Sequence, residues 1–496
     1  MKFARSSGIL LHPTALPGKY GIGTLGSEAF DFIDFLVQSM QNLWQVCPLG
    51  PTGYGDSPYQ CFSAFAGNPL LINLEKLARQ GLLTENDLNE HNIFEPGDID
   101  FEKVICFKYP LLRKAFKTYK QYSPKKQQNR FSNFCKHNSD WLEDYALFMS
   151  VKEQFGGKPW IEWDNDIKLR KEAAISYYQH ELAEEMQFHK FIQFLFFDQW
   201  LEVRSYANRN YINIIGDIPI FVAFDSADAW SNSEIFQFDE NKNPEYVAGV
   251  PPDYFSSTGQ LWGNPVYNWE YLRNTGFSWW IKNIRSKLKL YDIIRIDHFR
   301  GFAAYWAVPF NDETAERGTW MPALGKELFE TIEHELGVLP IIAEDLGHIT
   351  PDVYQLRDQF GFPGMKVLQF AFDSDEINQH APHNFARNTV VYTGTHDNDT
   401  TMGWFEKAKK SDKELALSYF NSDGKEVHWD YIRNAWSSVA VMAIAPMQDF
   451  LGLGSEARFN TPGVLGGNWK WRLKEGMLKD DLADRIRFLS ELYERA

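Results

Sequence analysis

The sequence predicts an α/β protein whose core is a closed (β/α)8 TIM barrel with large insertions. Eight short apolar runs that suit buried parallel strands recur along the chain, and helical patterns lie between them. A length of 496 residues suits several domains or one large domain with insertions. An open doubly wound sheet remains the alternative, because periodicity does not show whether a sheet closes.

The eight candidate strands extend from the N-terminal region almost to the C-terminus. Each is a short apolar run, and several end on polar residues that suit the start of a loop. In chain order they fall within residues 7–12, 43–49, 212–222, 292–299, 340–347, 365–372, 389–397 and 439–453.

The interval between the second and third candidate strands is too long for a single crossover. Residues from about 75 to 205 are rich in Lys, Glu and Gln with helical spacing, and 181–203 carries a broad apolar stripe that predicts an amphipathic helix returning to the barrel. We therefore predict three parts. They are a barrel formed by residues 1–74 and 206–496, a mainly helical insertion over 75–205, and a loop-rich subdomain over the active-site cleft at 221–290.

Charge and composition restrict the class of partner. The formal net charge of −16 and the pI of about 5.3 argue against nucleic acid and anionic membranes, whereas a neutral substrate fits. Aromatic residues make up 16% of the chain, which suits a large core or a surface that stacks on ligands.

The N-terminal segment and the cysteine content of the sequence favour a cytoplasmic protein. The N-terminal segment has too short an apolar run for a secretory signal, and no stretch of about 18 apolar residues occurs. The four cysteines form no CxxC pair, so reduced thiols are expected rather than disulfides or a zinc site.

Acidic residues stand where three candidate strands end, namely Asp297, Glu344 and Asp397, and Asp217 lies in the third strand. The carboxyl ends of barrel strands share one mouth, so these side chains are expected to converge although they are far apart in sequence. Several carboxylates in one partly desolvated mouth are costly, and function is the natural reason to keep them.

Glycoside cleavage with retention requires two such acids. One carboxylate attacks the anomeric carbon, and a carboxylic acid with a raised pKa protonates the leaving oxygen. Arg295 shares a strand face with Asp297 and is expected to keep that carboxylate ionised and oriented. The alternative is a buried structural Arg295–Asp297 pair, with the other acids capping helices.

Several motifs together resemble the amylomaltase family of 4-α-glucanotransferases, which share the α-amylase-type barrel. The resemblance runs from about Ser6 to Arg472. The motifs are GYGDSPYQ (53–60), GDIPIFVAFDSADAW (216–230), GVPPDYFSSTGQLWGNPVYNW (249–269), RIDHFRGF (295–302), AEDLG (343–347), FAFD (370–373), TGTHDNDT (393–400) and NTPG with GNWKWR (460–472).

The resemblance implies a retaining transfer of α-1,4-glucan segments between malto-oligosaccharides, with release of glucose and no metal or organic cofactor. It implies that Asp297 is the nucleophile, that Glu344 is the general acid/base and that Asp397 stabilises the transition state. The partners implied are a malto-oligosaccharide donor and a glucose or maltodextrin acceptor; whether the protein is a monomer or a homodimer stays open. The implied substrate-binding residues are Ser57, Tyr59, Asp217, Tyr254, Phe255, Gln260, Trp262, Arg295, His298, Asp373, His396 and Asn460.

Two alternatives to transfer stay open. An α-1,4-glucan hydrolase forms the same covalent intermediate but releases it to water, and an inactive glucan-binding protein would not need its acids. The stretch 249–269 resembles a lid that binds the acceptor sugar through Tyr254, Phe255, Gln260 and Trp262, although a stretch with these residues alone is more often a packed loop.

Overall fold

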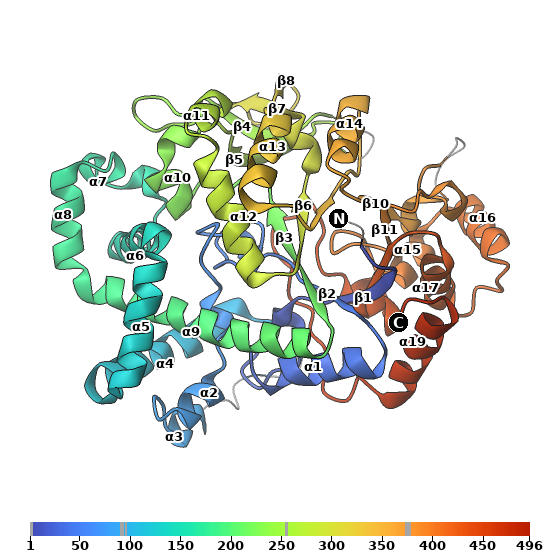
Figure 1. Cartoon of the computed structure of the whole chain (residues 1–496), viewed down its shortest axis with the longest axis horizontal. Helices are drawn as coiled ribbons and strands as arrows, with labels where there is room; N and C mark the ends of the chain where they lie inside the picture. Colours follow the sequence, from blue (N-terminus) through green and yellow to red (C-terminus); the bar gives the residue numbers. More distant parts are fainter. Residues whose placement is uncertain (1–2, 90–93, 95–96, 253–255, 373–377) are drawn as a thin grey trace.

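A parallel eight-stranded sheet forms the centre of the protein. The computed structural model describes residues 3–89, 94, 97–252, 256–372 and 378–496 (Figure 1). The strands follow the order β10-β11-β12-β1-β2-β3-β6-β9. Their bounds are β1 (Ser6–Leu10), β2 (Leu43–Gln45), β3 (Asn213–Pro219), β6 (Ile293–Asp297), β9 (Ile341–Ala343), β10 (Gly364–Val367), β11 (Thr389–Tyr392) and β12 (Met442–Pro446).

The sheet closes into a barrel. The strands at the two ends of the order, β9 and β10, meet where the amide of Ala343 donates a 3.0 Å hydrogen bond to the carbonyl of Pro363. Each of the eight predicted segments overlaps one of the eight strands, so the predicted barrel is confirmed and the open sheet is wrong.

Apolar side chains fill the barrel interior. One buried cluster takes at least one residue from every strand of the barrel, as packing inside a closed sheet requires. On β6 this interior residue is Ile293, and because side chains alternate along a strand, Arg295 and Asp297 lie on the same inward face nearer the mouth. The members of the cluster are Leu10, Leu43, Ile215, Ile293, Ile342, Met365, Val367, Val390, Tyr392, Val441, Met442 and Ile444.

Helices occupy the chain between β2 and β3, on the left in Figure 1. The last of them buries the predicted apolar stripe and returns to the barrel, where the indole of Trp200 donates a 3.1 Å hydrogen bond to the carbonyl of Leu290. These helices are α2 (Leu74–Arg79), α3 (Glu85–Leu88), α4 (Phe101–Tyr122), α5 (Lys125–His137), α6 (Ser139–Gln154), α7 (Asn165–Lys168), α8 (Glu172–Glu181) and α9 (Ala183–Arg209).

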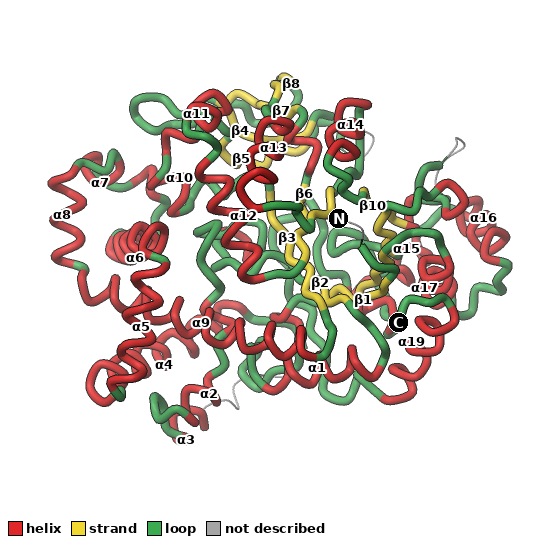
Figure 2. The backbone as a smooth tube through the Cα atoms, viewed as in Figure 1, coloured by secondary structure: helices red, strands yellow, loops and turns green. Residues whose placement is uncertain are grey.

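The remaining helices surround the strands or follow their ends (Figures 1 and 2). Their bounds are α1 (Ser27–Gln38), α10 (Ala227–Ser231), α11 (Trp269–Asn274), α12 (Ser278–Leu290), α13 (Gly325–Leu336), α14 (Pro351–Gln359), α15 (Thr401–Lys407), α16 (Lys410–Phe420), α17 (Val427–Ser437), α18 (Met447–Phe450) and α19 (Asp480–Leu492). No helix within the described ranges is both long enough and apolar enough to cross a membrane.

A second, antiparallel sheet lies beyond the upper end of the barrel strands in Figure 2. Its order is β5-β4-β7-β8, with β4 (Tyr246–Val250), β5 (Gln260–Pro265), β7 (Ala304–Pro309) and β8 (Thr319–Pro322). Residues 221–290, expected to be loop-rich, therefore contain two strands of this sheet and α10, α11 and α12, and α12 leads directly into β6.

Candidate active site

Three charged side chains meet inside the mouth of the barrel. The Nη1 atom of Arg295 lies 2.9 Å from Oδ1 of Asp297 and 2.5 Å from Oδ2 of Asp217 on the neighbouring strand. The side chains of Arg295 and Asp217 are almost fully buried, whereas that of Asp297 is 30% exposed. Asp297 is thus the member of this cluster that a substrate can reach, with a guanidinium orienting its other side.

Glu344 follows β9 and is held by two main-chain amides. The amide of His298 donates to Oε2 at 2.7 Å, and the amide of Leu346 donates to Oε1 at 2.9 Å. Burial raises the pKa of Glu344 well above its ordinary value, and the negative charge of Asp297 raises it further against the opposing effect of Arg295. Glu344 therefore keeps its proton to a higher pH than an ordinary glutamic acid does.

His298 connects this acid to the antiparallel sheet. Its backbone is left-handed, with φ of 49°, which directs its amide at Glu344. Burial lowers the pKa of the His298 imidazole to about 4, so the ring is neutral at pH 7. The indole of Trp262 on β5 packs edge to face against this imidazole, with ring centroids 4.8 Å apart. The indole N–H donates a 3.2 Å hydrogen bond to Oε1 of Gln260.

Asp397 and His396 form a second charged pair after β11. Nε2 of His396 lies 3.3 Å from Oδ2 of Asp397, and the side-chain amide of Asn460 donates to Oδ1 of Asp397 at 2.6 Å. Burial opposes ionisation of Asp397, but His396 and Asn460 outweigh it and lower its pKa to about 2. Burial likewise opposes the charged form of His396, yet the carboxylate of Asp397 raises the pKa of the imidazole. The pair therefore favours an ionised carboxylate beside an imidazolium.

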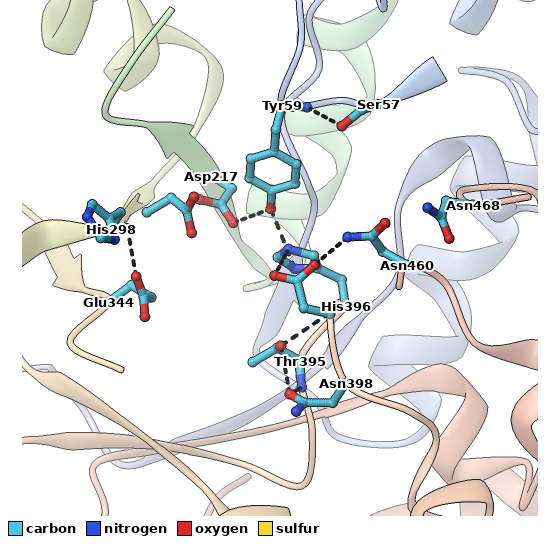
Figure 3. Close-up of polar contacts among 12 residues, drawn as sticks. Ser57, Tyr59, Asp217, His298, Glu344, Thr395, His396, Asn398, Asn460 and Asn468 are labelled. Carbon is cyan, nitrogen blue, oxygen red and sulfur yellow. Dashed lines mark hydrogen bonds and ion pairs between the residues drawn. The ribbon is translucent and has the colours of Figure 1, made fainter. Parts of the chain in front are cut away.

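Tyr59 links the two groups of charges, as Figure 3 shows. Its hydroxyl donates a 2.8 Å hydrogen bond to Oδ2 of Asp217 and lies 3.5 Å from Nδ1 of His396. The phenol ring stacks on His396 with centroids 5.0 Å apart. A continuous chain of polar contacts thus runs from Asp397 through Tyr59 to Asp297.

Most of the predicted substrate-binding residues lie around this network. Ser57 accepts a 3.2 Å hydrogen bond from the amide of Tyr59, and Figure 3 places it beyond that ring, away from His396. Tyr254, Phe255 and Asp373 lie outside the described residues. The structure therefore brings together Tyr59, Asp217, Arg295, Asp297, His298, Glu344, His396, Asp397 and Asn460, with Gln260 and Trp262 joined to them through His298.

Two residues that support the site were not singled out from the sequence. Trp469 packs at 5.8 Å from the rings of both Tyr59 and His396. Arg458 donates to the carbonyls of Asp397 and Asn460, each at 2.7 Å. Trp469 belongs to the motif GNWKWR and Arg458 lies two residues before the motif NTPG. No local pattern, however, shows that either side chain contacts the residues that follow β11.

The donor set suits acid–base chemistry. Within the described ranges, no three His, Cys, Asp or Glu side chains form a group able to hold a metal ion. The described mouth instead offers a carboxyl that retains its proton, a carboxylate paired with arginine, and an anion–imidazolium pair. A parallel barrel with this set at the C-terminal ends of its strands defines an enzyme that acts on glycosidic bonds.

Comparisons with known proteins give the family. A family model described as 4-alpha-glucanotransferase matches residues 11–479. The 4-alpha-glucanotransferase of Synechocystis sp. is 52% identical over 99% of this chain and 98% of its own, and that of Thermus thermophilus is 49% identical over 100% of both. The solved amylomaltase from Streptococcus agalactiae in complex with acarbose superposes with a TM-score of 0.96 at 41% identity, covering 99% of this chain and 100% of that chain. The chain belongs to the 4-alpha-glucanotransferase family.

Proposed function

We propose that the protein transfers α-1,4-glucan segments from a malto-oligosaccharide donor to glucose or a maltodextrin acceptor, releasing glucose, by retaining double displacement. The observation that carries the proposal is the convergence of Asp297, held by Arg295, and Glu344, which keeps its proton, at one mouth of the barrel. Family membership supports transfer over hydrolysis and over an inactive binding protein.

Asp297 is the nucleophile in this proposal. Its inward-facing carboxylate attacks the anomeric carbon while the bond to the leaving sugar breaks, giving a covalent glycosyl-enzyme. Arg295 holds one carboxylate oxygen at 2.9 Å and leaves the other available, and Asp217 accepts a second hydrogen bond from the same guanidinium at 2.5 Å. No metal or organic cofactor enters these steps.

Glu344 acts twice. Its proton passes to the leaving oxygen in the first half-reaction, and its carboxylate then takes the proton of the acceptor hydroxyl in the second. The raised pKa favours the acid in the first role, and the amides of His298 and Leu346 stabilise the carboxylate in the second. One fixed group can therefore serve both directions.

Asp397, His396 and Asn460 are proposed to hold the sugar ring under attack. A carboxylate accepts hydrogen bonds from sugar hydroxyls and stabilises positive charge as it develops at the anomeric centre. Tyr59 and the buried Asp217 position this group relative to Asp297. Ser57 and Asp373 are proposed as further sugar contacts.

Transfer requires an acceptor sugar that competes with water. Water is present at about 55 M, and a well-oriented acceptor reaches effective molarities of roughly 10⁵ M or more. We propose that Trp262 and Gln260, beside His298, bind this acceptor together with Tyr254 and Phe255.

We propose the same division of the chain as above: a catalytic barrel of residues 1–74 and 206–496, a helical insertion over 75–205, and a subdomain at 221–290. We also propose that the protein works in the cytoplasm. All four cysteines are free thiols in the structure, which supports a reducing compartment.

Products from maltotriose test the proposal. Two maltotriose molecules should give maltopentaose and glucose, followed by longer oligomers, in a chromatogram taken over time. Formation of only maltose and glucose by water addition would contradict transfer. Asp297→Asn should abolish both product series, whereas an inactive binding protein would not need that carboxylate.

A further inference from the structure

The seam of the barrel lies beside Glu344. The strands β9 and β10 are the two ends of the hydrogen-bonded order, and the backbone bond between Ala343 and Pro363 joins them. Glu344 and Asp345 follow β9 directly. The acid proposed for catalysis therefore stands at the place where strand pairing contributes least to fixing the backbone.

Asp345 bridges this seam through its side chain. Its Oδ1 accepts a 2.7 Å hydrogen bond from the amide of Met365 on β10, and its Oδ2 accepts one from Nη1 of Arg357 on α14 at 2.5 Å. Asp345 is only 1% exposed, so these bonds form away from water. One carboxylate oxygen is thereby tied to β10, across the seam, and the other to α14, which connects β9 to β10 along the chain.

Gly364, the first residue of β10, makes room for this bridge. A Cβ atom at this position would lie 2.4 Å from Oδ2 of Asp345 and 2.6 Å from Nη1 of Arg357. Any larger residue would displace the carboxylate or the guanidinium. The contact thus depends on two residues: Asp345, in the loop after β9, supplies the carboxylate, and Gly364 on β10 has no side chain to obstruct it.

The bridge acts on Glu344 through the chain. Glu344 turns its carboxyl to the amides of His298 and Leu346, whereas Asp345 turns its own to β10 and α14. Because hydrogen bonds hold the side chains of both Glu344 and Asp345 to different partners, the backbone that joins these two residues has little freedom to move. An error of about 1 Å in an acid's position costs on the order of a hundredfold in rate.

We propose that Asp345 is a positioning residue for the acid/base: its bridge to Met365 and Arg357 closes the seam and fixes Glu344 against the leaving oxygen. The inference rests on the role proposed for Glu344. Asp345 touches no reacting atom, so it acts only through the geometry of its neighbour. The proposal predicts that loss of the bridge slows the step in which Glu344 protonates the leaving oxygen and has little effect on bond cleavage that needs no proton.

Two donors separate that defect from a general one. When the enzyme takes a maltotriosyl group from a glucan, the rest of the glucan leaves through an oxygen that must be protonated, whereas α-maltotriosyl fluoride releases fluoride as an anion without a proton. For Asp345→Asn, kcat/KM with the glucan donor should fall about 10–100-fold and kcat/KM for fluoride release less than about threefold. Gly364→Ala should give the same pattern, because it displaces the bridge while every charge remains.

Matched variants make each outcome decisive. Asp228 is an equally buried acid that accepts a 2.7 Å hydrogen bond from the amide of Ala64, and Asp228→Asn should lower the melting temperature without distinguishing the donors. Equal losses on both donors for Asp345→Asn and Gly364→Ala, or no loss on the glucan, would overturn the proposal. Glu344→Gln is assayed in parallel. If it fails to distinguish the donors, the acid role of Glu344 fails, and that result differs from failure of the seam variants alone.

Discussion

The main-chain amide of His298 donates a 2.7 Å hydrogen bond to the carboxyl of Glu344, 46 residues further along the chain. A second bond, from the amide of Phe299 to the carbonyl of Glu344 at 3.0 Å, fixes the same pair of loops. Because His298 follows Asp297 directly, these hydrogen bonds hold the backbone next to Asp297 against Glu344 and keep the two carboxyl groups close together. The charge of Asp297 consequently raises the pKa of Glu344.

Replacing Glu344 by Gln should slow both half-reactions, because one group donates a proton and later accepts one. We expect kcat on malto-oligosaccharides to fall by about 10²–10⁴-fold. With α-maltotriosyl fluoride, stopped-flow measurement should show a fast first release of fluoride followed by slow transfer to the acceptor. Full rescue of acceptor transfer by that donor would contradict the dual role.

The alkaline side of the pH profile should report Glu344. An ordinary glutamic acid loses its proton near pH 4.3, but burial and Asp297 raise this pKa, so the acid stays protonated to a higher pH. We expect kcat/KM with maltotriose to be maintained well above pH 5 and to fall only as the pH passes the raised value. The fall should disappear with the fluoride donor; its persistence there would assign the limb to another group.

The same shift should make Glu344 destabilising at high pH. A carboxyl whose pKa is raised by folding binds a proton more tightly when folded, so stability is lost as the pH rises above the unfolded pKa. Glu344→Gln should therefore increase the free energy of unfolding at pH 8 by on the order of 1–2 kcal/mol. Below pH 4 the gain should vanish, because both states are then protonated. Thermal unfolding at both pH values measures the difference, and a gain independent of pH would point to packing instead.

Removing the hydroxyl of Tyr59 should weaken the link between the two groups of charges. Tyr59→Phe keeps the stacked ring but deletes the hydrogen bond to Asp217 and the contact with His396. We expect kcat to fall about tenfold, equivalent to about 1.4 kcal/mol. The matched control is Tyr206→Phe, which deletes an exposed 2.7 Å bond from tyrosine to Asp34 and should leave kcat unchanged. Equal effects of the two variants would refute a role for the link.

Shortening Trp262 should shift the enzyme from transfer towards hydrolysis. Trp262→Ala removes the indole that meets His298 and opens the proposed acceptor site to water. In water enriched in ¹⁸O, the share of new reducing ends that carry the isotope should rise severalfold, and Trp262→Phe should restore most of the transfer. An unchanged isotope share would remove Trp262 from the acceptor site.

Local pattern predicted the barrel well, since each predicted segment overlaps one strand and misses its bounds by at most one residue at the start. Burial on both faces makes parallel strands read as short apolar runs, and the face that Arg295 and Asp297 share on β6 was visible from their alternation along the strand. The antiparallel sheet was missed. Its strands have mixed exposure, and β4 pairs with β7, which lies beyond β6 in the chain, so no neighbouring pattern reveals the pairing.

The sequence by itself determined the number of barrel strands and the acids at their ends, because both depend on residues a few positions apart. Only the tertiary structure decided that the sheet closes between β9 and β10, that the amide of His298 and the carboxylate of Asp297 act on Glu344, and that Tyr59 joins Asp217 to His396. These features depend on distances of a few ångströms between residues far apart in the chain. Hydrogen bonds and charge effects act over such distances, so protonation within the mouth is set by folding and has no counterpart in local sequence.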